Sequence, residues 1–306
     1  MSEGDVNTVP SAASATGGET PAAGVTGLSI RGLTLSIATK RESTPILRGI
    51  DLEIPAGRVT GLAGESGSGK TMTGLAVCGL QPAGSRLGGV IELHSERVQV
   101  PNLLTLRSNA LNRVRGREVA MVFQDPTASL HPMISIGGQL TDHMRFHLGL
   151  SKKDARARAV DLLQRVRVPN PAEALDRYPH QFSGGQLQRI AIASAIACDP
   201  GVLIADEPTT ALDVTVQAGV LRLLRELCDD LGLAVLLVTH DLGVMSAVAD
   251  TIAVMHRGEI VEHGDRFQVI TDPRSEYTRS LIESLPDTPP PGALLDADEE
   301  GATDAR

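Results

Sequence analysis

A short apolar run, a glycine-rich loop and a helix-forming stretch follow one another from Val59, and this succession restricts the possible folds most. The run Val59–Ala63 leads into GESGSGKT over residues 64–71, which fits the pattern G-x-x-x-x-G-K-[ST]. Glycines let backbone N–H groups close around phosphate oxygens, and the start of a helix adds a favourable dipole. We therefore expect a strand, a phosphate-binding loop and a helix.

Two side chains of this loop have a specific expected task. Lys70 is predicted to reach the β- and γ-phosphates of a nucleotide, and the Thr71 hydroxyl is predicted to ligate Mg²⁺. A chance glycine-rich turn is the alternative, but such a turn needs neither the preceding strand nor the lysine and the hydroxyl. The predicted phosphate-binding residues are Gly64, Glu65, Ser66, Gly67, Ser68, Gly69, Lys70 and Thr71.

Further apolar runs alternate with helical stretches along the chain, at Val202–Ala205, Ala234–Val238 and Ile252–Met255. Runs that are apolar throughout are typical of parallel strands covered by helices on both faces. Aromatic residues make up only 2% of the chain, so aliphatic side chains must fill this core. Residues 127–180 break the alternation and look mainly helical, for example Lys152–Val166, which predicts an inserted helical subdomain.

Composition sets the expected limits of the folded part. Residues 1–27 are rich in Ala, Gly, Ser and Thr, and residues 287–306 are acidic after a proline-rich start, so both are predicted to be disordered tails. Residues 28–286 are expected to form one α/β domain, with the helical subdomain at 127–185. No apolar run approaches the ~20 residues that cross a bilayer, so a membrane-spanning part is expected on another polypeptide.

Charge and cysteine content exclude some classes of function. The net charge of −9 falls mostly on the two tails and leaves about −1 for residues 28–286. This part offers no basic field for nucleic acid, so no nucleic-acid partner is expected. Cys78, Cys198 and Cys228 form no C-x-x-C pair, and we expect buried small side chains rather than a metal site or disulfides.

Two carboxylates follow the apolar run Val202–Ala205. Asp206 is predicted to hold Mg²⁺, directly or through water, and Glu207 to polarise the water that attacks a γ-phosphate. Many strands end in acidic turns, so this pattern is weak by itself. It becomes specific in combination with the phosphate-binding loop.

A serine and two glycines precede a helical run that extends to about Cys198. The sequence at Ser183, Gly184, Gly185 and Gln186 reads SGGQ, and such a helix start is able to bind an anion. A plain helix N-cap is the alternative, and in isolation it would be the better interpretation.

The order of these motifs resembles that of ABC-type ATPases over residues 28–286. The phosphate loop, Gln124, SGGQ, the acidic strand end, Ala211-Leu212-Asp213 and His240 follow one another as in that family. The resemblance implies a P-loop NTPase core with a parallel sheet, a small antiparallel β subdomain and an inserted helical subdomain. It also implies ATP and Mg²⁺ as cofactors.

The same resemblance implies roles and partners. Two such domains would pair head-to-tail, as a homo- or heterodimer, with ATP between the phosphate loop of one and the SGGQ segment of the other. Gln124 would join Thr71 and Asp206 at Mg²⁺ and couple the site to the permeases. Asp213 would contact the opposite subunit, and His240 would touch the γ-phosphate. In one respect the chain departs from the family: Leu33–Ile37 lacks the aromatic residue that usually stacks on adenine.

Two segments resemble the peptide and nickel importer branch, at Arg115–Pro126 with the following TASLHP and at Glu276–Pro286. The branch implies two permease subunits, an extracytoplasmic solute-binding protein and a place at the cytoplasmic face of the membrane. Longer members carry a cysteine-bearing extension that has no counterpart here, so no iron–sulfur cluster is expected. The alternatives are another solute, an exporter subunit, or a non-transport ATPase that acts on ribosomes or DNA.

Overall fold

The computed structural model describes residues 27–38, 43–210 and 212–284. The two predicted tails therefore lie outside the described residues, apart from Gly27, where the first strand begins. In the described part, no helix combines the length and the apolar character that crossing a membrane requires.

A six-stranded sheet forms the centre of the molecule, in the order β10-β9-β3-β8-β7-β6. Neighbouring strands from β9 to β6 are parallel, and only β10 pairs antiparallel, with β9. The predicted apolar runs are all strands of this sheet. The strands are β3 (Arg58–Ala63), β6 (Val119–Val122), β7 (Val202–Asp206), β8 (Ala234–Val238), β9 (Thr251–His256) and β10 (Glu259–Asp265).

A second, antiparallel sheet lies beside the first, in the order β2-β1-β4-β5. Its strands are β1 (Gly27–Ala38), β2 (Ser43–Pro55), β4 (Ser85–His94) and β5 (Gln99–Val100). Side chains alternate between the two faces of a strand, and β7 shows the result. Leu203 and Ala205 join the core under the helices, whereas Val202 and Ile204 join the core shared with the antiparallel sheet.

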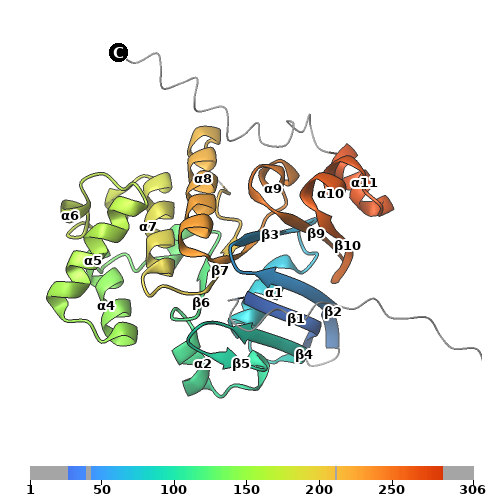
Figure 1. Cartoon of the computed structure of the whole chain (residues 1–306), viewed down its shortest axis with the longest axis horizontal. Helices are drawn as coiled ribbons and strands as arrows, with labels where there is room; N and C mark the ends of the chain where they lie inside the picture. Colours follow the sequence, from blue (N-terminus) through green and yellow to red (C-terminus); the bar gives the residue numbers. More distant parts are fainter. Residues whose placement is uncertain (1–26, 39–42, 211, 285–306) are drawn as a thin grey trace, which may run out of the picture.

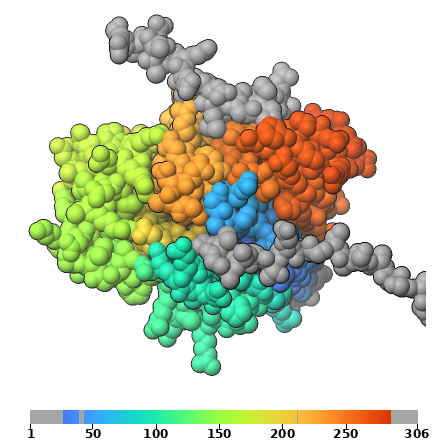
Figure 2. All heavy atoms as spheres, in the orientation of Figure 1, coloured from blue at the N-terminus to red at the C-terminus, as the bar shows by residue number. Residues whose placement is uncertain are grey.

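Most of the helices between β6 and β7 gather into a lobe at one side of the central sheet (Figures 1 and 2). The predicted helix at Lys152–Val166 is α5, which buries Ala155, Ala159 and Leu163 and is therefore a packed helix. The segment between β6 and β7 holds α3 (Pro126–Ser129), α4 (Ile136–Leu148), α5 (Lys152–Arg165), α6 (Pro171–Ala174) and α7 (Gly184–Ile196).

The remaining helices cover the sheets or connect their strands. They are α1 (Lys70–Val77), α2 (Ser108–Val114), α8 (Val214–Leu231), α9 (Leu242–Val248), α10 (Arg266–Thr271) and α11 (Glu276–Glu283), with short 3₁₀ turns at Leu103–Thr105 and Pro179–Gln181. The three cysteines are buried, as predicted, and are free. Burial raises the pKa of Cys78 to about 12 and that of Cys228 to about 11, so both are inert thiols.

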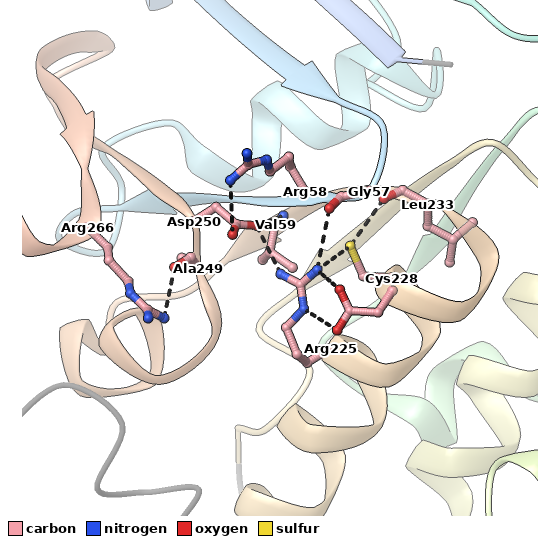
Figure 3. Close-up of polar contacts among 10 residues, drawn as sticks. Gly57, Arg58, Val59, Arg225, Cys228, Leu233, Ala249, Asp250 and Arg266 are labelled. Carbon is pink, nitrogen blue, oxygen red and sulfur yellow. Dashed lines mark hydrogen bonds and ion pairs between the residues drawn. The ribbon is translucent and has the colours of Figure 1, made fainter. Parts of the chain in front are cut away.

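A polar network fixes the start of β3, the strand that leads to the phosphate loop (Figure 3). The Asp250 carboxylate accepts hydrogen bonds from the Val59 backbone N–H at 2.8 Å and from Arg225 Nη1 at 2.9 Å. Arg225 comes from α8 and also donates to the Gly57 carbonyl oxygen. Asp250 thus joins β3, α8 and the start of β9.

Replacing Asp250 by alanine is expected to lower the free energy of unfolding by about 2–4 kcal/mol, because it leaves Val59 N–H and part of the Arg225 charge unpaired. Asp229→Ala is the matched control. Asp229 binds the same arginine from an exposed position on α8, so its loss should cost less than about 1 kcal/mol. Urea unfolding followed by circular dichroism measures both. Equal losses would show that the hydrogen bond between Asp250 and Val59 N–H adds nothing to the free energy of unfolding.

Candidate active site

A cavity of about 730 Å³ opens at the carboxyl end of the central sheet. Parallel sheets bind ligands at this edge, because the loops that follow the strands converge there. Gln124 follows β6, Glu207 follows β7 and His240 follows β8. The lining residues are Ile46, Gly64, Glu65, Ser66, Gly67, Gly69, Lys70, Thr71, Met72, Gln124, Glu207, Thr210, His240 and Leu281.

The phosphate loop depends on glycine where it crosses β9. At Gly64, φ is +145° and a Cβ atom would lie 2.2 Å from the Met255 carbonyl oxygen, so no other residue fits. Lys70 Nζ donates to the carbonyl oxygens of Gly64 at 2.7 Å and Glu65 at 2.9 Å. Burial lowers the pKa of Lys70, while the carboxylates nearby oppose this shift. Ser68 is buried and, alone among the predicted loop residues, does not line the cavity.

Three side chains hold the Glu207 carboxylate. Gln124 Nε2 and Thr210 Oγ1 each donate to its Oε2 at 2.8 Å, and His240 Nδ1 lies 3.0 Å from its Oε1. Burial raises the pKa of Glu207, but the bonds to His240 and Thr210 outweigh burial, and the pKa is lowered overall. The backbone of Glu207 has φ of +44°, a rare conformation for a side-chain-bearing residue, of the kind that clusters at functional sites.

Asp206 and Thr71 provide oxygen atoms that can ligate a metal ion at the phosphate loop. Thr71 Oγ1 donates to Asp206 Oδ1 at 3.1 Å, and burial raises the pKa of Asp206. Mg²⁺ binds hard oxygen donors and takes few ligands from a protein when phosphates and waters supply the rest, so this pair fits the predicted ion. No cluster of three or more His, Cys, Asp or Glu suited to a metal occurs among the described residues. Gln124 contacts Glu207 through its nitrogen, and its part in the magnesium site stays a prediction.

The SGGQ segment and Asp213 do not line this cavity. Ser183 caps α7 by accepting a hydrogen bond from Gln186 N–H, and Asp213 caps α8 by accepting one from Val216 N–H at 2.9 Å. That hydrogen bond lowers the pKa of Asp213. Gly185 allows close packing of α7 on α8, since a Cβ atom there would lie 2.5 Å from Val216. Both segments thus have local structural roles in this chain. The catalytic roles predicted for them would have to be exercised outside this cavity.

The structure adds lining residues that the sequence did not single out. Thr210 stands three residues after Glu207 and faces it, a spacing that the motif alone does not reveal. Ile46 and Met72 carry no recognisable signal, and Leu281 comes from near the end of the chain, in a segment noted only for its resemblance to one importer branch. Ile37 is partly buried against the core of the antiparallel sheet, and residues 39–42 beside it lie outside the described part.

Known proteins resemble this chain in sequence and in fold. The ABC transporter family model matches residues 47–210. A putative peptide import ATP-binding protein of Brucella abortus (strain 2308) is 49% identical over 228 residues, which are 74% of this chain and 67% of the relative. Oligopeptide transport ATP-binding protein AppD of Bacillus subtilis (strain 168) is 42% identical over 259 residues, 85% of this chain and 78% of that protein.

Solved structures agree with the sequence relatives. The dimeric structure of the bacterial ABC transporter cassette MJ0796 matches with a TM-score of 0.68 and 27% identity, covering 78% of this chain and 98% of that one. The family match extends over more than half of the chain and includes the phosphate loop, Gln124, SGGQ and Glu207. The chain therefore belongs to the ABC transporter family.

Proposed function

We propose that this chain is the ATP-binding and ATP-hydrolysing subunit of an importer that takes up di- or oligopeptides. The observation that carries the proposal is the position of Glu207. Its ionised carboxylate lies in the same cavity as the phosphate loop and is held by Gln124, Thr210 and His240. A fixed carboxylate beside a γ-phosphate is suited to orient and polarise the attacking water.

Each group of the cavity then has a task in hydrolysis. Lys70 is already buried in the loop, and we expect it to exchange the carbonyl oxygens of Gly64 and Glu65 for phosphate oxygens. Thr71 and Asp206 would hold Mg²⁺, which offsets phosphate charge when bound. His240, next to Glu207, is placed to keep the water and the γ-phosphate in line.

A complete site would need a second cassette. Ser183 and Asp213 lie outside the cavity of their own chain, as expected if they complete the cavity of a partner. A dimeric cassette and its post-hydrolysis dimer with ADP and Pi are among the matching solved structures, which supports pairing of this kind. The partner would be a second copy or a related chain.

Membrane partners are proposed from the surface next to Gln124. Leu80 and Phe123 are exposed and line a second cavity of about 250 Å³ beside this residue, and Met133, Ile134 and Phe146 are exposed on the nearby helical lobe. Exposed apolar side chains around one cavity, such as Leu80 and Phe123, are typical of a docking surface. We propose that two permease subunits dock here and hold the chain at the cytoplasmic face of the membrane, with a solute-binding protein acting indirectly.

The solute class is proposed from the relatives. Those in Brucella and Bacillus are named for peptide import and oligopeptide transport, and a further relative at 40% identity is named for glutathione import. All three names refer to peptides. The two segments of the chain that resemble the peptide importer branch support the same class.

A pull-down tests the proposal. Tagged Glu207→Gln protein, loaded with Mg-ATP to hold the closed dimer, is incubated with detergent-solubilised native membranes, and its partners are identified by mass spectrometry. Lys70→Ala protein, which should not bind ATP, is the matched control. We expect two polytopic membrane proteins to be enriched with the first variant, and more strongly than with the control. Enrichment of ribosomal or DNA-bound proteins instead would reject import and leave the ATPase chemistry in place.

A further inference from the structure

Helix α11 (Glu276–Glu283) comes from near the end of the chain, yet it reaches the phosphate loop. The backbone N–H of Glu65 donates to Tyr277 Oη at 3.4 Å. Burial raises the pKa of Tyr277, so its hydroxyl keeps its proton at neutral pH. No step of the hydrolysis described above uses this helix.

Glu65, the residue that Tyr277 contacts, also holds the phosphate-binding Lys70. The Glu65 N–H donates to Tyr277, and the Glu65 carbonyl oxygen accepts from Lys70 Nζ at 2.9 Å. A side chain that fixes Glu65 therefore fixes the resting position of Lys70. It also orients the first peptide group after Gly64, where the loop begins.

Leu281 reaches the cavity itself. It stands four residues after Tyr277, so the two side chains lie on the same face of the helix. Leu281 lines the cavity together with the glycines of the phosphate loop and Ile46. Leu281 and its neighbour Ile282 both pack against the main core, but Ile282 does not line the cavity. Leu281 and Ile282 thus have similar size, but only Leu281 is placed to contact a nucleotide in the cavity.

A second contact sets the position of α11. The rings of Tyr277 and His256 lie with centroids 4.0 Å apart and planes tilted by 39°. His256 ends β9, and Gly258, in the turn that follows, donates its N–H to the Ser68 carbonyl oxygen at 2.9 Å. The helix is thus tied both to the start of the phosphate loop and to the turn that supports its middle.

We propose that α11 forms a wall of the nucleotide cavity and determines nucleotide affinity, with Tyr277 positioning the phosphate loop and Leu281 making an apolar contact with the bound nucleotide. This inference rests on the proposed ATP site. It gives the chain a source of affinity that does not depend on an aromatic residue in Leu33–Ile37. The alternative is that α11 only packs against the core and has no effect on binding.

Two variants separate these possibilities. Tyr277→Phe keeps the ring on His256 and removes only the hydroxyl, so the KM for ATP should rise about three-fold at unchanged kcat, as expected for one neutral hydrogen bond. Leu281→Ala removes an apolar contact, so the Kd of a fluorescent ATP analogue should rise about five-fold. Tyr178→Phe and Ile282→Ala are the matched controls, and both should leave affinity unchanged. Unfolding midpoints of all four variants report any general loss of stability.

The chain provides its own optical probe of this contact. It contains two tyrosines, Tyr178 and Tyr277, and no tryptophan. The Tyr178→Phe control therefore leaves Tyr277 as the single strong emitter. ATP should change the Tyr277 emission saturably, at the same concentrations that calorimetry gives for binding.

The outcomes distinguish this inference from the proposed function. If the unmodified chain binds no ATP, the proposed site fails and the inference fails with it. If that chain binds ATP but Tyr277→Phe and Leu281→Ala bind it equally well, or the Tyr277 emission does not respond, α11 only packs against the core and the inference alone is overturned. The inference that α11 forms a wall of the cavity is supported if Tyr277→Phe raises the KM for ATP and Leu281→Ala raises the Kd of the ATP analogue. Unfolding midpoints must stay normal and both controls must keep their affinity.

Discussion

Replacing Glu207 by glutamine is expected to lower ATP hydrolysis by about 10²–10⁴-fold, the usual contribution of a general base, while ATP binding survives. Glutamine has nearly the same shape and still accepts hydrogen bonds from Gln124 and Thr210, so the cavity should keep its form. It lacks the negative charge that polarises water. Phosphate release measures hydrolysis, and calorimetry measures binding.

Glu226→Gln is the matched control for this change. Glu226 is an exposed carboxylate on α8 that pairs with Arg167 and does not line the cavity, so its loss should leave the rate unchanged. The lowered pKa of Glu207 means that its carboxylate is charged throughout the neutral range, and the full effect should therefore appear at neutral pH. A Glu207→Gln protein that hydrolyses ATP at the original rate would remove Glu207 from the mechanism.

Most of the central sheet could be predicted because four of its strands, β3, β7, β8 and β9, contain a short, mainly apolar run. Val202–Ala205 and Ala234–Val238 have no periodicity to misread, and their burial on both faces explains their composition. The antiparallel sheet was expected only from the resemblance to a family. Its strands alternate in part, as at residues 50–54, where buried apolar and exposed polar side chains follow one another, but register shifts interrupt the pattern.

The cavity could be predicted only in part, and for a physical reason. Lys70, Glu207 and His240 belong to motifs that are continuous in the sequence, and the strand ends bring them together. Thr210 and Leu281 line the cavity because the fold brings a loop and a distant helix to it. The positive φ of Glu207 is likewise a property of the fold, and residue type does not reveal it.

A substitution of Ser183 by arginine should lower hydrolysis by about 10²-fold or more, the range for loss of a donor to developing charge, and leave ATP binding to the single chain intact. Ser183 lies outside the cavity of its own chain, so the change cannot disturb the phosphate loop directly. In a closed dimer the arginine would meet the partner's nucleotide. Hydrolysis is measured by phosphate release, and binding by calorimetry below the concentration at which the chain dimerises.

Ser151→Arg is the matched control, because Ser151 caps α5 as Ser183 caps α7. Both changes remove an N-cap, at a cost of about 1 kcal/mol of stability. A lower rate of hydrolysis in Ser183→Arg than in Ser151→Arg therefore reports a functional role of Ser183. Where the chain pairs with itself, mixing Ser183→Arg with Lys70→Ala should restore part of the activity, since one of the two sites then has an intact loop and an intact serine. Parallel loss of binding and hydrolysis in Ser183→Arg would refute the shared site, because a residue that serves only the partner cannot weaken binding to its own chain.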